Sequence, residues 1–338
     1  MLGKFPVKTV LAVDGGASKV DVAVVDAKGN VLRTVRRRGR FNFGLGSNGS
    51  MDGLARAIRA AQASSPATPS LGVFCLAGAD IAIDDRRIAS EVGARRWVRR
   101  AVVRNDTFAV LRAGTDRKWG VAIVCGTGMN CAGVGPDGSS VRFPSFGELS
   151  GDRAHGGGWL GRTALGAAIR ARDGRGPRTL LERLVPLHFG MSRPTAVMEA
   201  VYVGRLNAER LSELAPIVFR AAARQDAVAL AMLEEVSEEI VVTANAAIRR
   251  LRLADRDVHV VLGGGILRAA GDAMIARITA GIQRLAPRAV VLRLDAPPVL
   301  GAALIGLDLL RAPAQAHHHL RESFPRSGDG HHRRSPTF

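Results

Sequence analysis

Two short segments that combine glycines with a hydroxyl could bind phosphate. The first is Asp14-Gly-Gly-Ala-Ser18 and the second is Cys125-Gly-Thr-Gly128. Backbone N–H groups bind phosphate oxygens best in a turn where no side chain obstructs the approach. The carboxylate of Asp14, which ends an apolar strand, is in addition a candidate ligand of Mg²⁺ or of its waters. Together the two turns predict a nucleoside triphosphate bound from both sides across a cleft.

A third glycine run, Gly263-Gly-Gly265, follows the apolar segment 258–262. It would let a flat adenine or ribose approach the backbone, and a tight turn between a strand and a helix is the alternative. It does not form a GxGxxG motif with a following acidic residue, and neither hydroxyl-bearing turn is a GxxxxGK[ST] loop. Ordinary hairpins, which need glycine for their geometry, remain the alternative for those two turns.

An internal duplication places these motifs on elements. Three pairs of segments match in the same order along the chain: 11–31 with 121–138, 74–79 with 260–265, and 103–111 with 292–300. The first pair has an apolar strand, a glycine-hydroxyl turn, a second apolar strand and a polar turn that closes on glycine. The duplication predicts two homologous α/β domains that each open with an antiparallel hairpin.

Helices are predicted between these strands, and the pattern ends before the C-terminus. Apolar residues spaced by three and four predict helices over 51–63, 82–95, 158–172, 205–224 and 226–252. Beyond Ala312 the periodicity stops in a segment rich in His, Ser, Gly and Pro, where a metal site is the less favoured alternative. We therefore expect an N-terminal domain over 1–117, a C-terminal domain over 118–312 and a disordered basic tail over 313–338.

The net charge invites a nucleic-acid interpretation that the composition does not support. The chain of 338 residues carries +18 at pH 7, but only five of its 48 basic residues are lysines, which is typical of a GC-rich codon bias. Aromatic residues make up 4% and offer few stacking platforms for single strands. The sequence shows no membrane span, signal peptide or CxxC pair, so we expect a cytoplasmic protein without specific nucleic-acid or membrane partners, with a homodimer left open.

The ordered set of motifs resembles the actin-like ATPase superfamily, which includes heat-shock chaperones and sugar kinases. Within it, the chain is most similar to the BadF/BadG/BcrA/BcrD ATPase family with its N-acetylglucosamine kinase branch, over about residues 8–311. The resemblance rests on these segments: 14–19, 104–108, 125–130, 151–152 and 262–265. It implies duplicated ribonuclease H-like α/β domains, each a mixed five-stranded sheet with flanking helices, and an ATP cleft between them.

The resemblance also implies an activity and a site. The activity is ATP- and Mg²⁺-dependent phosphorylation of a hydroxyl, the 6-hydroxyl of N-acetylglucosamine or of a related amino sugar or hexose. Asp106 would be the general base, and its place after the strand 102–104 agrees with that role, a simple helix cap at Thr107 being the alternative. The residues implied to contact Mg²⁺ or ATP are Asp14 (also the metal ligand), Gly15, Gly16, Ser18, Lys19, Gly126, Thr127, Gly128, Gly263, Gly264 and Gly265. Those implied to contact the sugar are Asn42, with Asn48 as the fallback, Asn105, Asp106, Asn130 and Asp152.

One loop departs from the pattern of the branch. The branch usually has Gly-Asp-Glu-Gly-Ser-Gly after the second hairpin, whereas this chain has Gly151-Asp-Arg-Ala-His-Gly-Gly-Gly158. Because this loop contacts sugar substituents in the family, specificity for the acetamido group is the least secure inference. His155 is either a surface histidine of the loop or a substrate contact.

Three other functions remain as alternatives. The family includes ATPases that activate acyl-CoA dehydratases through a [4Fe–4S] cluster, which needs cysteines at a subunit interface, whereas Cys75, Cys125 and Cys131 fall in predicted core strands or the phosphate turn. A sugar-responsive transcription regulator would need a DNA-binding domain for which the segment before Lys8 is too short. A sugar-binding regulator without catalysis is disfavoured by Asp106.

Overall fold

The computed structural model describes residues 8–39, 41–44, 48–63 and 68–325. The chain divides into two compact units. The first unit comprises Met1–Ala122, Ala132–Gly138 and Leu292–Phe338, and the second unit comprises Ile123–Cys131 and Ser139–Val291.

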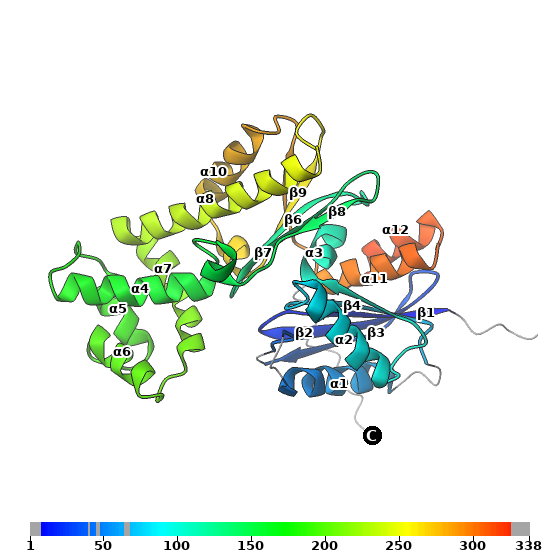
Figure 1. Ribbon diagram of the computed structural model, residues 1–338, viewed down its shortest axis with the longest axis horizontal. Coiled ribbons are helices and arrows are strands. Elements are labelled where there is room, and N and C mark those ends of the chain that lie inside the picture. The colour runs from blue at the N-terminus through cyan, green and yellow to red at the C-terminus, as the bar shows by residue number, and fades with distance from the viewer. Residues whose placement is uncertain (1–7, 40, 45–47, 64–67, 326–338) are drawn as a thin grey trace, which may run out of the picture. The chain divides into compact units, whose positions relative to one another are not determined.

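A mixed five-stranded sheet forms the centre of the first unit (Figure 1). Its strands are β1 (Thr9–Gly15), β2 (Lys19–Asp26), β3 (Val31–Arg38), β4 (Leu71–Leu76) and β5 (Ala101–Asn105), in the spatial order β3-β2-β1-β4-β5. The pairs β1–β2 and β2–β3 are antiparallel, and the pairs β1–β4 and β4–β5 are parallel. The carboxyl ends of β1, β4 and β5 therefore lie along one edge of the sheet.

Both faces of this sheet are covered, because successive residues of a strand point to opposite faces. Leu11 and Val13 of β1 pack with helices α1 (Asn48–Gln62) and α2 (Ala82–Ala94). Val10 and Ala12 pack on the other side, with helices α3, α11 and α12. These three helices span Asp106–Gly114, Pro298–Leu309 and Ala314–Ser323. Apolar residues on both faces of β1 explain its continuous hydrophobic run.

The second sheet has the spatial order β10-β9-β6-β7-β8. Its strands are β6 (Gly120–Cys125), β7 (Met129–Val134), β8 (Ser140–Arg142), β9 (His259–Gly263) and β10 (Val290–Arg293). The order repeats that of the first sheet, with β6 in the place of β1 and β9 in the place of β4. The predicted duplication of a mixed five-stranded sheet with flanking helices is confirmed.

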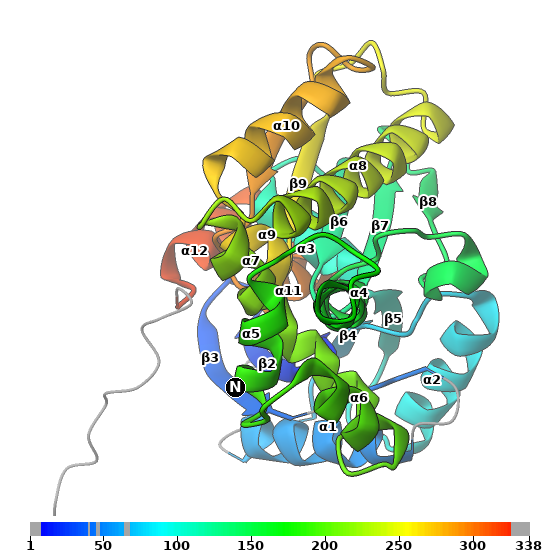
Figure 2. The ribbon, with the colours of Figure 1, turned by 90° about the vertical axis from the view of Figure 1, so that its left-hand side faces the viewer.

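The second unit carries two groups of helices. The long α8 (Ala227–Arg250) runs beside α10 (Asp272–Gln283), and Figure 2 shows the pair over the sheet. The other group surrounds α4 (Gly157–Arg172), which is seen nearly end-on in Figure 2. A Cβ on Gly161 of α4 would lie 1.9 Å from the backbone oxygen of Leu211, so only glycine allows this close packing.

Several boundaries differ from the prediction. The helix expected over 205–224 is two elements, a 3₁₀ helix (Ala208–Leu214) and α7 (Ala215–Ala222), which meet just before a proline, Pro216. The pattern also misses α5 (Leu181–His188), α6 (Pro194–Tyr202), α10 and α11. Helices α5 and α6 have only eight or nine residues and too few turns for a clear period.

The predicted division at 117/118 and at 312/313 also differs from the structure. Residues 292–312 belong to the first unit, since α11 packs against β1 and α3. The expected disordered tail is wrong over 314–323, which form α12. Ala316 and Leu320 of α12 and the following Phe324 join the first unit's core, and three apolar residues were too few to give a periodic signal. Residues 326–338, with His331 and His332, lie outside the described residues.

Among the residues that the structure describes, no helix combines the length and the apolar character needed to cross a membrane.

Candidate functional site

The first glycine-hydroxyl turn connects β1 to β2 and presents backbone N–H groups. The carbonyl oxygen of Ala17 accepts a hydrogen bond from the N–H of Phe41 at 2.9 Å, and that of Ser18 accepts one from Gly39 at 3.1 Å. In a trans peptide the N–H points opposite to the carbonyl, so the N–H of Ser18 points away from Phe41. Ala17 and Ser18 are exposed. The turn can therefore offer an N–H group and the Ser18 hydroxyl to an anion.

Packing explains the first glycine of this turn. A Cβ on Gly15 would lie 2.5 Å from Leu76 Cδ2 and 2.8 Å from Phe43 Cε2, so a larger residue would displace the core. Gly16 has no such neighbour, and its N–H donates to the carbonyl of Lys19 at 3.0 Å to close the turn. A Cβ on Gly16 would meet only that oxygen, at 3.9 Å. Gly15 is thus required by the fold, while Gly16 keeps the turn open.

The second turn, between β6 and β7, is built in the same way within the second unit. The carbonyl oxygens of Gly126 and Thr127 accept hydrogen bonds, each of 2.8 Å, from the N–H groups of Gly157 and Gly158 at the start of α4. The N–H groups of Thr127 and Gly128 consequently point away from α4. Thr127 and Gly128 are exposed, as are the matching residues of the first turn. Both turns have carbonyls bound to a neighbouring segment and N–H groups directed away from it.

The glycines at the start of α4 have a role that the sequence did not reveal. Gly156 has φ +99°, and a Cβ there would lie 2.7 Å from the carbonyl oxygen of Gly128. A Cβ on Gly157 would lie 3.0 Å from the carbonyl oxygen of Gly126. The glycines of the divergent loop 151–158 thus support the second turn. The repeated Gly-Gly-Gly is the available signal, although the family resemblance assigns this loop to the sugar.

The glycine run after β9 lies beside the second turn. Gly264 has φ +98°, and a Cβ there would come within 2.2 Å of the carbonyl oxygen of Cys125. Gly265, which begins the short helix α9 (Gly265–Ala269), has no atom within 4 Å of the place of a Cβ. The tight strand-to-helix turn and an open approach to the backbone therefore occur together, at Gly264 and Gly265 respectively.

Asp106 begins α3 but is not its N-cap. Asn105 has that role, because its Oδ1 accepts a hydrogen bond of 3.0 Å from the N–H of Thr107. The Nδ2 of Asn105 donates to Asp80 Oδ1 at 2.7 Å, and Asn105 is fully buried. The predicted sugar contact by Asn105 is therefore corrected, since its two polar atoms bind protein groups. As a residue, Asp106 is partly exposed.

Burial and neighbouring charges shift two carboxyl groups of the first unit. Desolvation raises the pKa of Asp106 to about 8, and the negative charges of Asp14 and Asp80 add to the rise. Desolvation also raises the pKa of Asp14 to about 7, against the opposing charge of Lys19. Carboxyl groups with pKa values near neutrality can take up or release a proton at physiological pH.

Lys19 is engaged with a different acid. Its Nζ lies 2.5 Å from Asp21 Oδ2 and 3.9 Å from Asp14 Oδ2. Asp21 also accepts two hydrogen bonds from Arg36, which hold the pKa of Asp21 below its usual value against the effect of burial. The predicted phosphate contact by Lys19 would require its ammonium group to leave or share Asp21.

The candidate sugar residue Asn42 has a defined orientation. Its Oδ1 accepts a hydrogen bond of 2.9 Å from Gly44, and its N–H donates to Ser50 Oγ at 2.6 Å. The side-chain amide N–H groups of this exposed residue thus face away from the bond to Gly44. A guanidinium N–H of Arg87 on α2 donates to the carbonyl of Phe43 and fixes the same loop. The side chain of Asn48 lies outside the described residues.

The candidate sugar residues of the second unit lie in two segments. Asn130 is on β7, where its Oδ1 accepts a hydrogen bond of 2.7 Å from the N–H of Cys131. Asp152 accepts one of 2.6 Å from Ser150 Oγ and is partly exposed. His155 lies 3.3 Å from Glu148 Oε1, and a Cβ on Gly147 would meet its ring at 3.0 Å. The partial burial of His155 makes it a structural part of this loop as well as a residue that a ligand could reach.

The three cysteines are free and fully buried. Desolvation raises the pKa of Cys125 to about 12 and also raises the pKa values of Cys75 and Cys131. A thiol that is buried and protonated is not presented to a cluster at the protein surface. The structure thus offers no support for the iron–sulfur activator alternative at these positions.

Comparison with known families identifies the chain. The sequence profile of the BadF/BadG/BcrA/BcrD ATPase family matches residues 11–306. The chain belongs to this family, as the motifs predicted.

Two relatives of the chain are sugar kinases by name. The chain is 24% identical to the N-acetylmuramic acid/N-acetylglucosamine kinase of Clostridium acetobutylicum, over 77% of this chain and 86% of the relative. It is 25% identical to the N-acetyl-D-glucosamine kinase of Dictyostelium discoideum, over 88% of this chain and 97% of that relative. The similarity thus extends over nearly the whole of each enzyme.

Solved structures confirm the fold. A Chromobacterium violaceum protein, provisionally assigned as an N-acetylglucosamine kinase, matches with a TM-score of 0.69 and 26% identity, over 88% of this chain and 99% of that chain. A ROK family glucokinase from Streptomyces griseus, in complex with glucose and AMPPNP, matches with a TM-score of 0.56 and 17% identity, over 89% and 98%. The second match, at its low identity, supports the fold alone.

Proposed function

We propose that this protein is an ATP-dependent kinase that transfers the γ-phosphoryl group to the 6-hydroxyl of N-acetylglucosamine or a related amino sugar. The observation that carries the proposal is Asp106, a partly exposed residue directly after β5 whose desolvated carboxyl has a pKa of about 8. The kinase relatives from Clostridium and Dictyostelium support the substrate class.

The nucleotide would be bound by the glycine turns. The N–H groups of Ser18, Thr127 and Gly128 are the proposed donors to phosphate oxygens. The carbonyl that precedes each of them is hydrogen-bonded to a neighbouring segment, which supports this proposal. Gly265, with its open backbone, is the proposed contact of the adenosine. The kinase relatives from Clostridium and Dictyostelium support ATP as the phosphoryl donor.

Asp14 is the proposed ligand of Mg²⁺, directly or through water. The carboxylate of the buried Asp14 and the hydroxyl of the exposed Ser18, four residues later in the chain, are hard oxygen donors of the kind that Mg²⁺ prefers, and one or two carboxylates are usual beside substrate phosphates. The ion, when bound, would neutralise charge on the phosphates. The side chain of Asp14 would orient it and would be held ionised by it.

Asp106 would act as the general base. As the sugar oxygen forms its bond to the γ-phosphorus, the hydroxyl proton passes to the Asp106 carboxylate, and the bond from phosphorus to the leaving oxygen of ADP breaks. The raised pKa makes Asp106 a stronger proton acceptor than an ordinary carboxylate, but it must first be ionised. Asn42, Asn130 and Asp152 are the proposed contacts of the ring hydroxyls.

The requirement for ATP and the three free, buried cysteines support a cytoplasmic location.

A coupled assay of ADP release tests the proposal. We expect release that depends on an added amino sugar, across a panel of N-acetylglucosamine, N-acetylmuramic acid, glucosamine, N-acetylmannosamine and glucose. Asp106→Asn should lower kcat by about 10²-fold or more, the scale expected for a general acid–base group. Asp272→Asn is the matched control, because Asp272 begins α10 as Asp106 begins α3. If none of the sugars in the panel makes the wild-type protein release ADP, the proposal is refuted.

The position of transfer needs a separate measurement. Phosphorus–proton NMR correlation on the product should place the phosphate on C6, and the 6-deoxy analogue should bind without turnover. Transfer to another hydroxyl would leave the kinase activity intact and reject only the 6-hydroxyl.

A further inference from the structure

The helix α12 lies outside the part of the chain that the family profile matches. The family profile ends at residue 306, and α12 begins at Ala314. In the first unit α12 lies beside α11 (Figure 1), and its Leu320 is fully buried in the same core cluster as Val10 and Ala12 of β1. A Cβ on Gly29 would lie 2.1 Å from the backbone oxygen of Ala316, so this helix is also in close contact with the turn after β2.

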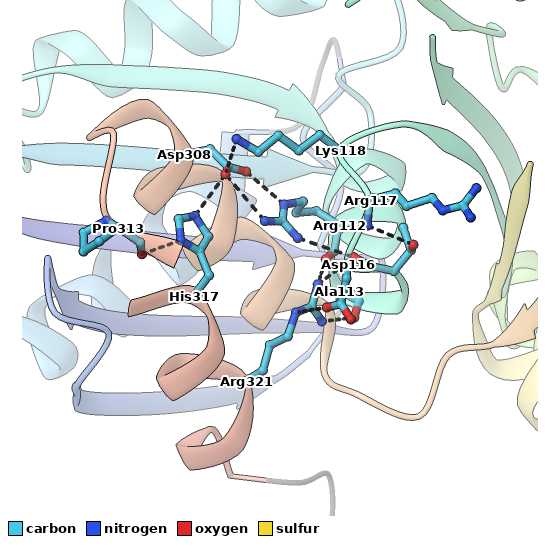
Figure 3. Close-up of polar contacts among 10 residues, drawn as sticks. Arg112, Ala113, Asp116, Arg117, Lys118, Asp308, Pro313, His317 and Arg321 are labelled. Atoms are coloured by element: carbon cyan, nitrogen blue, oxygen red, sulfur yellow. Dashed lines mark hydrogen bonds and ion pairs between the residues drawn. The ribbon is translucent and has the colours of Figure 1, made fainter. Parts of the chain in front are cut away.

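One side chain of α12 binds the C-terminal end of α3. The guanidinium of Arg321 donates hydrogen bonds to the carbonyl oxygens of Ala113 at 2.8 Å, Arg112 at 2.8 Å and Thr115 at 2.6 Å (Figure 3). Its Nε also lies 2.8 Å from Asp116 Oδ1. The last carbonyls of a helix have no partner within the helix, and a cation there interacts favourably with the helix dipole. Arg321 is therefore a C-terminal cap supplied to α3 from a distant part of the sequence.

A second group of ionic contacts joins the same helices. Arg112 of α3 is nearly buried and donates to Asp308 of α11 at 2.9 Å. Asp308 is also 3.0 Å from His317 Nε2 of α12 and 3.3 Å from Lys118 Nζ, as Figure 3 shows. Burial would raise the pKa of Asp308, but the hydrogen bond and charge of Arg112, together with the charge of Lys118, hold it below its usual value. Asp308 thus connects α11 to both α3 and α12.

Helix α3 depends on such external contacts. It has nine residues, which is too short for stability on its own. Asn105 caps its N-terminus, and a Cβ on Gly301 of α11 would lie 1.8 Å from the backbone oxygen of Ala109, so α11 touches the middle of α3. Arg321 supplies the contact at the other end. Because Asp106 is the first residue of α3, a rotation or fraying of this short helix would move the carboxyl.

We propose that α12 is a clamp on α3, and that Arg321 is a positioning residue for Asp106, acting through the backbone of α3. The catalytic part of this inference rests on the proposed kinase function. The mechanical part, that Arg321 holds α3, does not.

Amide hydrogen exchange of the free protein tests the mechanical part. We compare wild type with Arg321→Ala, and use Glu322→Ala as the control, since Glu322 is exposed on the same helix and pairs only with the exposed His318 among the contacts described. Loss of several charge-assisted bonds should speed exchange in α3 by about tenfold or more, while exchange in β2 stays the same. Glu322→Ala should match wild type. Unchanged exchange of α3 in Arg321→Ala would overturn the clamp.

Steady-state kinetics test the catalytic part. We expect Arg321→Ala to lower kcat by about tenfold with KM for ATP and sugar within about twofold, since a displaced base slows transfer more than binding. Faster exchange in α3 with an unchanged kcat would overturn the positioning role. If the wild type phosphorylates no sugar, the kinase proposal fails, and the exchange result still decides whether Arg321 holds α3.

Arg321→Lys keeps the test open if the alanine variant does not fold. A lysine ammonium can bind some of the same carbonyls but lacks the planar fork of the guanidinium. We expect the exchange rate of α3 and the kcat of this variant to lie between those of wild type and Arg321→Ala. If only the lysine variant folds, we expect its kcat to be lower than that of wild type by at most about threefold, with faster exchange in α3. A lysine variant identical to wild type in both measurements would overturn the specific role of the guanidinium.

Discussion

The side chain of Asn105 donates a hydrogen bond of 2.7 Å to Asp80, and its oxygen caps α3 through the N–H of Thr107. One fully buried amide thus joins the loop after β4 to the helix that begins with Asp106. The carboxylate of Asp80 is itself nearly buried, at 8% exposed, so this donor helps to offset the loss of its hydration.

Asn105→Ala should destabilise the protein more than an ordinary cap mutation. Loss of a helix cap costs about 1 kcal/mol, and leaving the buried Asp80 without this donor adds about 1–3 kcal/mol. Urea unfolding should therefore show a loss of about 2 kcal/mol or more. The control is Asn207→Ala, because Asn207 is an exposed cap whose side chain accepts from Glu209 N–H at 2.8 Å. Equal losses for the two variants would contradict the role of the Asn105–Asp80 bond.

Asp106→Asn should stabilise the protein at pH 8 while it lowers activity. Burial raises the folded-state pKa of Asp106 from 3.8 to about 8, so the folded protein retains a proton that the unfolded chain releases. Wild-type stability from this group is present below the unfolded value of 3.8 and is lost as pH rises through about 8. The asparagine variant escapes that loss.

Thermal melts at pH 5 and pH 8 check this sign. The increase in Tm of Asp106→Asn over wild type should be larger at pH 8 than at pH 5. Asp272→Asn, the same substitution at the first residue of α10, is measured beside it as the control. A gain that shrinks as pH rises would show that Asp106 is not held protonated by burial.

Asp80→Asn should shift the pH dependence of catalysis toward acid. The negative charge of Asp80 raises the pKa of Asp106, and removing it makes the base easier to ionise. The rising limb of kcat/KM against pH should move to lower pH, while the asparagine oxygen can still accept from Asn105. Because the charges of Asp14 and Asp106 influence each other, the apparent pKa of this limb belongs to the two carboxyl groups together. A limb that stays in place, or moves toward alkali, would contradict this electrostatic assignment.

The sequence predicted the repeated part of the architecture well. Both glycine turns and the order of the strands could be recognised because β-branched runs and glycines form local patterns that occur twice. The general location of Asp106, after a strand and before a helix, followed from the same patterns. The patterns did not reveal which residue caps that helix. Asn105 and Asp106 are both suitable caps, and only the contact of Asn105 with Asp80 distinguishes them.

Long-range contacts explain what the sequence did not reveal. Arg321 reaches α3 across more than two hundred residues of sequence, and no local period marks such a bond. The short α12 has only a few apolar residues in a polar segment, so tertiary packing rather than propensity makes it helical. The role of Gly156 was also hidden, because it depends on the carbonyl of Gly128 in another segment.

Two neighbouring glycines should respond differently to the same substitution. Gly264→Ala places a Cβ 2.2 Å from the carbonyl oxygen of Cys125 at a φ of +98°, so we expect a loss of stability of about 2 kcal/mol or more. Gly265→Ala meets no atom within 4 Å and should fold with nearly wild-type stability.

Nucleotide binding distinguishes the two roles. If adenosine approaches the backbone at Gly265, Gly265→Ala should weaken ATP binding by about tenfold through the added methyl group, with KM for the sugar unchanged. Isothermal titration with a non-hydrolysable ATP analogue, together with urea unfolding, gives both quantities on the same preparations. A Gly265→Ala variant with normal stability and normal nucleotide affinity would remove this residue from the proposed adenosine site, while Gly264 would keep its structural role.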